Sequence, residues 1–215
     1  MGKILLTGFD PFGEQDINPA TEVIKELAGK EIGGHQINAL EIPTVRYSSV
    51  KVIEEEIAEI NPEMVISIGQ AGGRTAISVE RVAINIDDFR IEDNEGHKPV
   101  DEPINPDGPT AYYSTLPIKA MVKKMKEEGI PAEISNTAGT FVCNHVMYGV
   151  LDYIDHRELE IPAGFIHIPF LPQQVVDKEG KASMALSTVK KGIHFALKAA
   201  IENKEDIKYQ AGKTH

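Results

Sequence analysis

The sequence contains almost no cysteine: Cys143 is the only one among 215 residues. A single cysteine excludes a disulfide within the chain and is typical of a reducing compartment, so we expect a cytoplasmic protein. A disulfide between two copies of the chain is the remaining alternative for this cysteine. Cys143 therefore needs an explanation of its own.

Long apolar runs are also absent. The stretch Ile4–Leu6 ends at once, which makes it too short for a signal-peptide core or a membrane span. We therefore expect no targeting segment and no association with membranes.

Positive charge is in deficit, because the formal net charge is -11 and the lysines are scattered. Binding to phosphate backbones depends on clustered Lys and Arg, so nucleic acid is not an expected partner. There is no HExxH motif, and the histidines and carboxylates show no familiar ligand spacing, which predicts no metal. The loop Gly8–Gly13 lacks both a P-loop lysine and the dinucleotide GxGxxG spacing, which predicts no nucleotide cofactor.

What the sequence does contain is the composition of a globular domain, with 41% apolar and 26% charged residues. Its length favours a single domain over residues 1–215, with a partly disordered tail from about residue 204. Apolar runs alternate with helical periodicity, the rhythm of an α/β sandwich with a mainly parallel sheet. Strands are predicted at 3–7, 36–42, 64–68, 132–135 and 165–168, an extended stretch at 76–87, and helices at 19–28, 50–60, 117–128, 143–155 and 184–202.

Cys143 follows a turn-like Ala-Gly-Thr segment and precedes apolar residues at helical spacing. This places its thiol near a helix N-terminus, where free N–H groups and the helix dipole favour the nucleophilic thiolate. The alternative interpretation is a small buried hydrophobic residue. His145 is two positions further along the helix, about 200° around it, so its side chain is expected to diverge from Cys143.

His167 lies inside the apolar strand GFIHIPFLP, with Ile166 and Ile168 on the opposite face. Strand ends in α/β sheets commonly border ligand crevices, although a satisfied core histidine is the equal alternative.

Glu80 belongs to AISVERVAIN, where period-two counting puts it on one face with Val82, Ile84 and Ile86. A carboxylate on an apolar face needs a partner, either a histidine or a structural salt bridge. Together Cys143, His167 and Glu80 supply a nucleophile, a base and an orienting acid, so the residues alone predict a cysteine hydrolase. Apolar loop residues, Phe9, Phe12, Phe141 and Val142, are candidates to line a pocket, with core packing as the alternative.

Several segments together resemble pyroglutamyl peptidase I, or pyrrolidone carboxyl peptidase, along nearly the full length. GQAGGRTAISVERVAIN (69–85), SNTAGTFVCNHVMY (135–148) and GFIHIPFLP (164–172) are similar to that family's glutamate, cysteine and histidine regions. TGFDPFG (7–13), followed by Asn18 and Pro19, and IDDFRIEDNEG (86–96) fit the same pattern.

The resemblance implies a three-layer α/β/α sandwich with a twisted mixed sheet of the phosphorylase/hydrolase type, and a homotetramer. It also implies hydrolysis after an N-terminal pyroglutamate through a thioester, without metal or cofactor. In the family pattern Glu80, Cys143 and His167 are catalytic. The expected substrate contacts are Phe9, Phe12, Phe141 and Val142 around the lactam ring, the Gln70 backbone, Thr44, and Arg90 near the reacting carbonyl.

Two other functions stay open from the residues. The glycines of GQAGG at 69–73 fit a phosphate cradle in a phosphorylase of related architecture. The second open function is that of a binding protein that has the pocket but does not catalyse a reaction.

Overall fold

The computed structural model describes residues 1–13 and 15–212. Its centre is a seven-stranded sheet in the order β2-β3-β1-β4-β9-β5-β8. The four strands β3, β1, β4 and β9 are parallel, β5 runs antiparallel to β9 and parallel to β8, and β2 is antiparallel to β3. The bounds are β1 (Gly2–Phe9), β2 (Glu31–Ile32), β3 (His35–Ile42), β4 (Met64–Gln70), β5 (Ile77–Glu80), β8 (Ala132–Ser135) and β9 (Ala163–Ile168).

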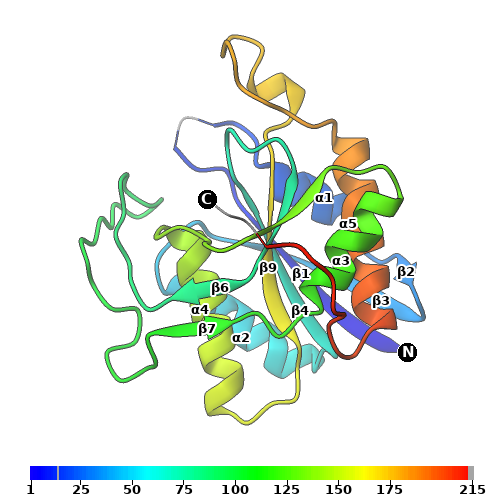
Figure 1. Ribbon diagram of the computed structural model, residues 1–215. Helices are drawn as coiled ribbons and strands as arrows, with labels where there is room; N and C mark the ends of the chain where they lie inside the picture. The colour runs from blue at the N-terminus through cyan, green and yellow to red at the C-terminus, as the bar shows by residue number, and fades with distance from the viewer. Residues whose placement is uncertain (14, 213–215) are drawn as a thin grey trace.

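Helices cover both faces of this sheet (Figure 1). On one face lie α1 (Pro19–Leu27), α3 (Ile118–Glu127) and α5 (Leu186–Glu202), and on the other lie α2 (Ser48–Ile60) and α4 (Val142–His156). A short 3-10 turn, η1 (Pro172–Gln174), follows β9. The predicted α/β class with three layers and a mainly parallel mixed sheet is confirmed.

The two faces of the sheet follow from strand alternation. Ile4 and Leu6 of β1 are buried against the α1, α3 and α5 layer, whereas Leu5 and Phe9 point to the α2 and α4 layer. The same alternation buries Ile166 and Ile168 of β9 against the α1, α3 and α5 layer. They therefore lie on the opposite face from His167, as predicted.

Helix α1 begins and ends as its sequence predicts. The Asn18 side chain accepts a hydrogen bond of 3.0 Å from the Ala20 N–H, and Pro19 occupies the first turn, where a missing N–H has no cost. Gly29, with φ of 70°, follows the last turn.

The extended stretch predicted over 76–87 is two strands rather than one. After β5 the chain leaves the main sheet at Arg81, and β6 (Val82–Ile84) pairs with β7 (Ala111–Tyr113) in a separate two-stranded sheet. Ile84 is 38% exposed. The interpretation that Glu80 shares one apolar face with Val82, Ile84 and Ile86 is therefore wrong, because the counting crossed a break between sheets.

One end of the α4-facing side of the sheet is polar although it is buried. Thr7, Ser67, His167 and Glu80 lie there at 4% exposure or less, near the ends of β1, β4, β9 and β5. Thr7 Oγ1 donates to Ser67 Oγ over 2.9 Å. Thr7, Ser67 and His167 belong to the parallel strands β1, β4 and β9, and the antiparallel strand β5 adds Glu80 beside them. Buried polar groups concentrated toward the carboxyl ends of parallel strands indicate a functional crevice.

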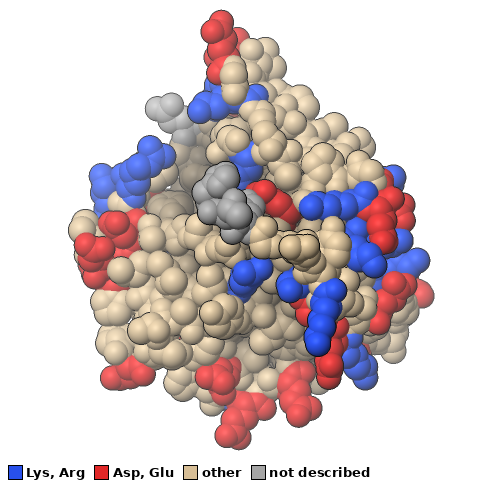
Figure 2. Space-filling view, viewed as in Figure 1, with Lys and Arg blue, Asp and Glu red and all other residues tan. Residues whose placement is uncertain are grey.

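The surface agrees with the scattered charge of the sequence. In Figure 2, Lys and Arg are interspersed with Asp and Glu on the face shown. Within the described residues, no helix has the length and apolar character needed to cross a membrane. Of the predicted tail, Asp206 accepts backbone N–H groups of Lys119 and Ala120 at the start of α3, and residues 213–215 lie outside the described part.

Helix α2 offers a matched test of the core. Ile53 is fully buried and Glu59 is exposed on the same helix. We expect Ile53→Ala to lower the free energy of unfolding by about 2–5 kcal/mol through lost burial and a cavity, and Glu59→Ala by less than about 0.5 kcal/mol. Urea unfolding of both variants measures this, and equal effects would contradict the assigned burial.

Candidate active site

Glu80 and His167 form a buried pair. Glu80, the last residue of β5, is fully buried, and His167 of the neighbouring strand β9 is 4% exposed. His167 Nδ1 lies 2.7 Å from Glu80 Oε1. In the antiparallel pairing of β5 and β9, Ser78 is opposite His167, so Glu80 is its diagonal neighbour on the same face.

This contact fixes the proton on the imidazole ring. A carboxylate only accepts hydrogen bonds, so Nδ1 of His167 must donate. In the neutral ring, Nε2 is then left as an acceptor and a base.

Arg74 completes the group around the carboxylate. It follows β4 in the loop that leads to β5, and its Nη1 donates to Glu80 Oε1 over 2.7 Å. Its Nη2 donates to the Thr137 carbonyl over 3.3 Å. The structural salt bridge and the histidine contact, considered as alternatives for Glu80, are thus both present.

Cys143 is the second residue of α4, as its sequence context predicts. Its thiol lies beside Gly69 of β4, the residue paired in register with His167. A Cβ at Gly69 would be 2.9 Å from Cys143 Sγ and 2.7 Å from Phe165 Cζ. Only a glycine therefore leaves room for the thiol at this position.

A cavity of about 250 Å³ opens over these residues. Cys143 and His167 line it together, whereas Glu80 lies behind the histidine and does not. The lining consists of Phe9, Phe12, Asn18, Thr44, Gln70, Ala71, Arg74, Thr137, Ala138, Gly139, Phe141, Cys143 and His167.

Five of the seven residues predicted to contact substrate line this cavity: Phe9, Phe12, Thr44, Gln70 and Phe141. The rings of Phe12 and Phe141 are 6.0 Å apart, and Phe89 packs on Phe141 at 4.7 Å.

The other two predicted contacts lie elsewhere. Val142 is fully buried in the core beneath α4, and Arg90 is exposed, and neither is among the described residues that line the cavity. Val142, the first residue of α4, belongs to the apolar core between the sheet and the α2 and α4 layer.

The family model described as Pyroglutamyl peptidase matches residues 2–203. The pyrrolidone-carboxylate peptidase of Bacillus mycoides is 55% identical over 215 residues, 100% of both chains, and that of Clostridium perfringens is 57% identical over 210 residues, 98% of both. The crystal structure of Bacillus amyloliquefaciens pyroglutamyl peptidase I superposes with a TM-score of 0.94 at 46% identity, covering 96% of this chain and 100% of that one. Pyrrolidone carboxyl peptidase from Thermococcus litoralis gives 0.94 at 39% identity, covering 97% and 99%.

The chain belongs to the pyroglutamyl peptidase family. The expected enzyme class, a cysteine-type hydrolase acting as a peptidase, is thereby confirmed.

Burial in this site favours the uncharged forms of Cys143 and His167. Burial and, to a smaller extent, the charge of Glu80 raise the pKa of the Cys143 thiol to about 12, and Arg74 opposes both. Burial also lowers the pKa of His167 below its ordinary value, although the hydrogen bond to Glu80 acts in the other direction. Burial thus acts against the helix N-terminus, which by itself favours the thiolate.

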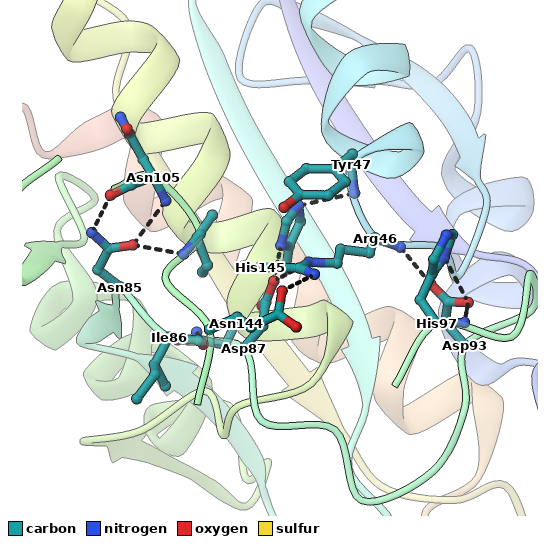
Figure 3. A network of polar contacts seen from close by, with 12 residues as sticks. Arg46, Tyr47, Asn85, Ile86, Asp87, Asp93, His97, Asn105, Asn144 and His145 are labelled. Atoms are coloured by element: carbon teal, nitrogen blue, oxygen red, sulfur yellow. Dashed lines mark hydrogen bonds and ion pairs between the residues drawn. The ribbon is translucent and has the colours of Figure 1, made fainter. Parts of the chain in front are cut away.

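The two residues after Cys143 anchor the first turn of α4 through a network of polar contacts (Figure 3). Asn144 Nδ2 donates to the carbonyls of Ile84 and Ile86 at 2.9 and 3.0 Å, and its Oδ1 accepts from the Ile84 N–H. Three hydrogen bonds from one buried side chain thus fix the helix start that carries the thiol.

His145 continues the anchor. Its Nδ1 donates to Asp87 over 2.8 Å, and its Nε2 accepts the Tyr47 N–H over 3.0 Å. Arg46 joins Asp87 to Glu102, with both contacts at 2.7 Å. The prediction that His145 diverges from Cys143 is correct: His145 is bound into this network (Figure 3).

The sequence analysis did not identify Arg74, although this residue lies within the glutamate region at 69–85. A sequence motif does not show which way a side chain in a loop points. The one signal for Arg74 is that a buried Glu80 needs a nearby cation. It also missed Gln174, which donates to Gln70 Oε1 over 2.7 Å and is separated from it by 104 residues.

Gly69 gives a direct test of this packing. We expect Gly69→Ala to displace Cys143 or Phe165 and to lower kcat/KM by roughly 10²-fold, because small misplacements of reacting groups have effects of that order. The loss of stability should be about 1–3 kcal/mol.

Gly192→Ala is the matched control, since a Cβ there meets Ile77 Cδ1 at 2.4 Å on the opposite face of the sheet. It should destabilise the fold while retaining most activity per folded molecule. Equal loss of activity in both variants would show that general overpacking, not thiol placement, is responsible.

Proposed function

We propose that this chain hydrolyses the amide bond after an N-terminal pyroglutamate, with Cys143, His167 and Glu80 as its catalytic triad. One observation carries the proposal: the hydrogen-bonded Glu80–His167 pair adjoins the same cavity as the sole cysteine, in a member of the pyroglutamyl peptidase family. The names of its relatives supply the substrate class. The proposed unit is the whole chain as one peptidase domain.

In the proposed reaction, Cys143 Sγ attacks the carbonyl carbon of the pyroglutamyl amide while His167 Nε2 takes the thiol proton. Proton transfer accompanies the attack, because burial raises the pKa of the thiol. The tetrahedral intermediate collapses, the C–N bond breaks, and His167 returns the proton to the leaving amine. Water then hydrolyses the thioester, which releases pyroglutamate and restores the thiol.

Glu80 serves this cycle by holding the imidazole. Its hydrogen bond keeps the proton on Nδ1 and stabilises the imidazolium that forms during attack. For the oxyanion, the Cys143 N–H is the proposed donor, because N–H groups in the first helical turn have no acceptor within the helix. Arg90, an expected second donor, stays a prediction.

The cavity suits a neutral ring. A pyroglutamyl group has no ammonium, and Phe9, Phe12 and Phe141 offer it apolar walls, with Gln70 at the end of β4 as a backbone hydrogen-bonding partner. The small volume of about 250 Å³ fits one such group rather than an extended peptide.

The phosphorylase alternative loses its main support. Gly69 and Gly72 are each explained by an aromatic neighbour: a Cβ at Gly72 would lie 2.2 Å from Phe170 Cζ, and one at Gly69 would meet Phe165. These glycines therefore make room for side chains, which removes the reason to assign them to phosphate. A non-catalytic binding protein remains distinguishable by the absence of amine release.

We further propose a cytoplasmic homotetramer, which rests on the family resemblance and on the single free cysteine. Light scattering should give four times the 23.6 kDa mass of the chain. A monomeric mass in an active preparation would refute the tetramer.

A chromogenic pyroglutamyl amide tests the triad. We expect Cys143→Ser and His167→Ala each to lower kcat by at least about 10³-fold, and Glu80→Gln by a smaller but still large factor, because the residues act as a unit. His156→Ala, on the exposed side of α4, is the matched control and should keep full activity. Undiminished turnover by the serine variant would exclude Cys143 as the nucleophile.

The pH dependence has a defined sign. Burial lowers the pKa of His167 below 6.5, so the ring releases its proton, and the base becomes available, at a pH below that value. We expect the acid limb of kcat/KM to have its midpoint below 6.5. A midpoint above 6.5 would mean that the Glu80 hydrogen bond outweighs burial.

A further inference from the structure

Two donors share a single oxygen of the buried carboxylate. Arg74 Nη1 and His167 Nδ1 both lie 2.7 Å from Glu80 Oε1. Glu80 Oε2 is buried and accepts no hydrogen bond from any described residue. The permanent charge that compensates Glu80 is therefore that of the arginine, since His167 can give up its charge.

Arg74 also reaches the segment before the cysteine. Its Nη2 donates to the Thr137 carbonyl, which also accepts the Ser135 hydroxyl over 3.1 Å. The Thr137 hydroxyl in turn accepts the Gly139 N–H over 3.0 Å. One guanidinium thus joins the loop after β4, the acid of β5 and the loop that leads into α4, and it does so at the wall of the cavity.

We propose that Arg74 is a positioning residue for the hydrolysis: it compensates the charge of Glu80, so that His167 stays neutral and able to accept the thiol proton, and it fixes the loop ahead of Cys143. This inference rests on the function proposed above and extends it to a residue outside the triad.

Charge balance in the buried site supports this role for Arg74. The titratable and charged groups that face His167 are Glu80 from β5, Arg74 from the β4–β5 loop and Cys143 from α4. Without the guanidinium, a protonated His167 would be the remaining cation beside Glu80, and a protonated imidazole is no longer a base.

Geometry makes a second, separable contribution. The planar guanidinium binds a carboxylate and a carbonyl from two nitrogens at once, which the point charge of a lysine does not reproduce. A lysine at this position should keep the charge effect and lose the alignment of the loop.

Three variants separate these contributions: Arg74→Met removes the charge, Arg74→Lys retains it, and Arg157→Met removes an exposed arginine at the end of α4 as the control. For Arg74→Met we expect the acid limb of kcat/KM to move to higher pH by about 0.5 to 1 unit, with kcat at least 10-fold lower. Arg74→Lys should keep the wild-type midpoint with a reduced kcat. Arg157→Met should match the wild type in both.

A second readout does not require the proposed substrate. Iodoacetamide labelling followed by intact mass is unambiguous, because Cys143 is the only cysteine. Removing a neighbouring cation raises the pKa of the thiol, so the pH dependence of labelling should shift upward in Arg74→Met and not in Arg74→Lys.

The outcomes distinguish the two proposals. If the wild type releases no amine from pyroglutamyl amides, the proposed function fails, and the labelling shift still decides the role of Arg74. If turnover is normal and neither pH profile moves in Arg74→Met, the inference is overturned. Should that variant not fold by circular dichroism, Arg74→Gln, which also lacks the charge, carries the same test.

Discussion

A buried carboxylate is the constraint on which this site depends. Glu80 is fully removed from solvent, and an ionised carboxyl group in such a place needs both hydrogen bonds and a compensating charge. His167 and Arg74 meet that need on one oxygen. The requirement determines the tautomer of the histidine, the path of the loop after β4 and the position of the segment that leads to Cys143.

The backbone brings the two halves of the site together through close approach. Gly69 allows the start of α4 to lie against the end of β4, and Asn144 and His145 secure the other side of that helical turn. The thiol is therefore held from both sides of its helix, by packing toward the sheet and by polar contacts away from it. Such support restricts the movement of a nucleophile that must attack from one direction.

The fold and the catalytic candidates were predictable because their signals are local. Apolar runs and helical periodicity indicated the layers, the Asn18-Pro19 pair marked the start of α1, and His167 stood out between two isoleucines. Other features depend on contacts between distant segments. The chain changes sheets at Arg81, and Gln174 reaches Gln70 across 104 residues. Arg74 reaches the Thr137 carbonyl, 63 residues away, in addition to the nearby Glu80. The environment of the Cys143 thiol also lies beyond local signals, because burial, which opposes the helix dipole, depends on the complete fold.

The central claim is that Cys143 carries the acyl group during turnover. Rapid mixing with a pyroglutamyl ester, acid quenching and peptide mapping by mass spectrometry test it directly. The account predicts a transient adduct of one pyroglutamyl group on the peptide that contains Cys143. Product release without any adduct on that peptide, under conditions where acylation outpaces hydrolysis, would contradict it.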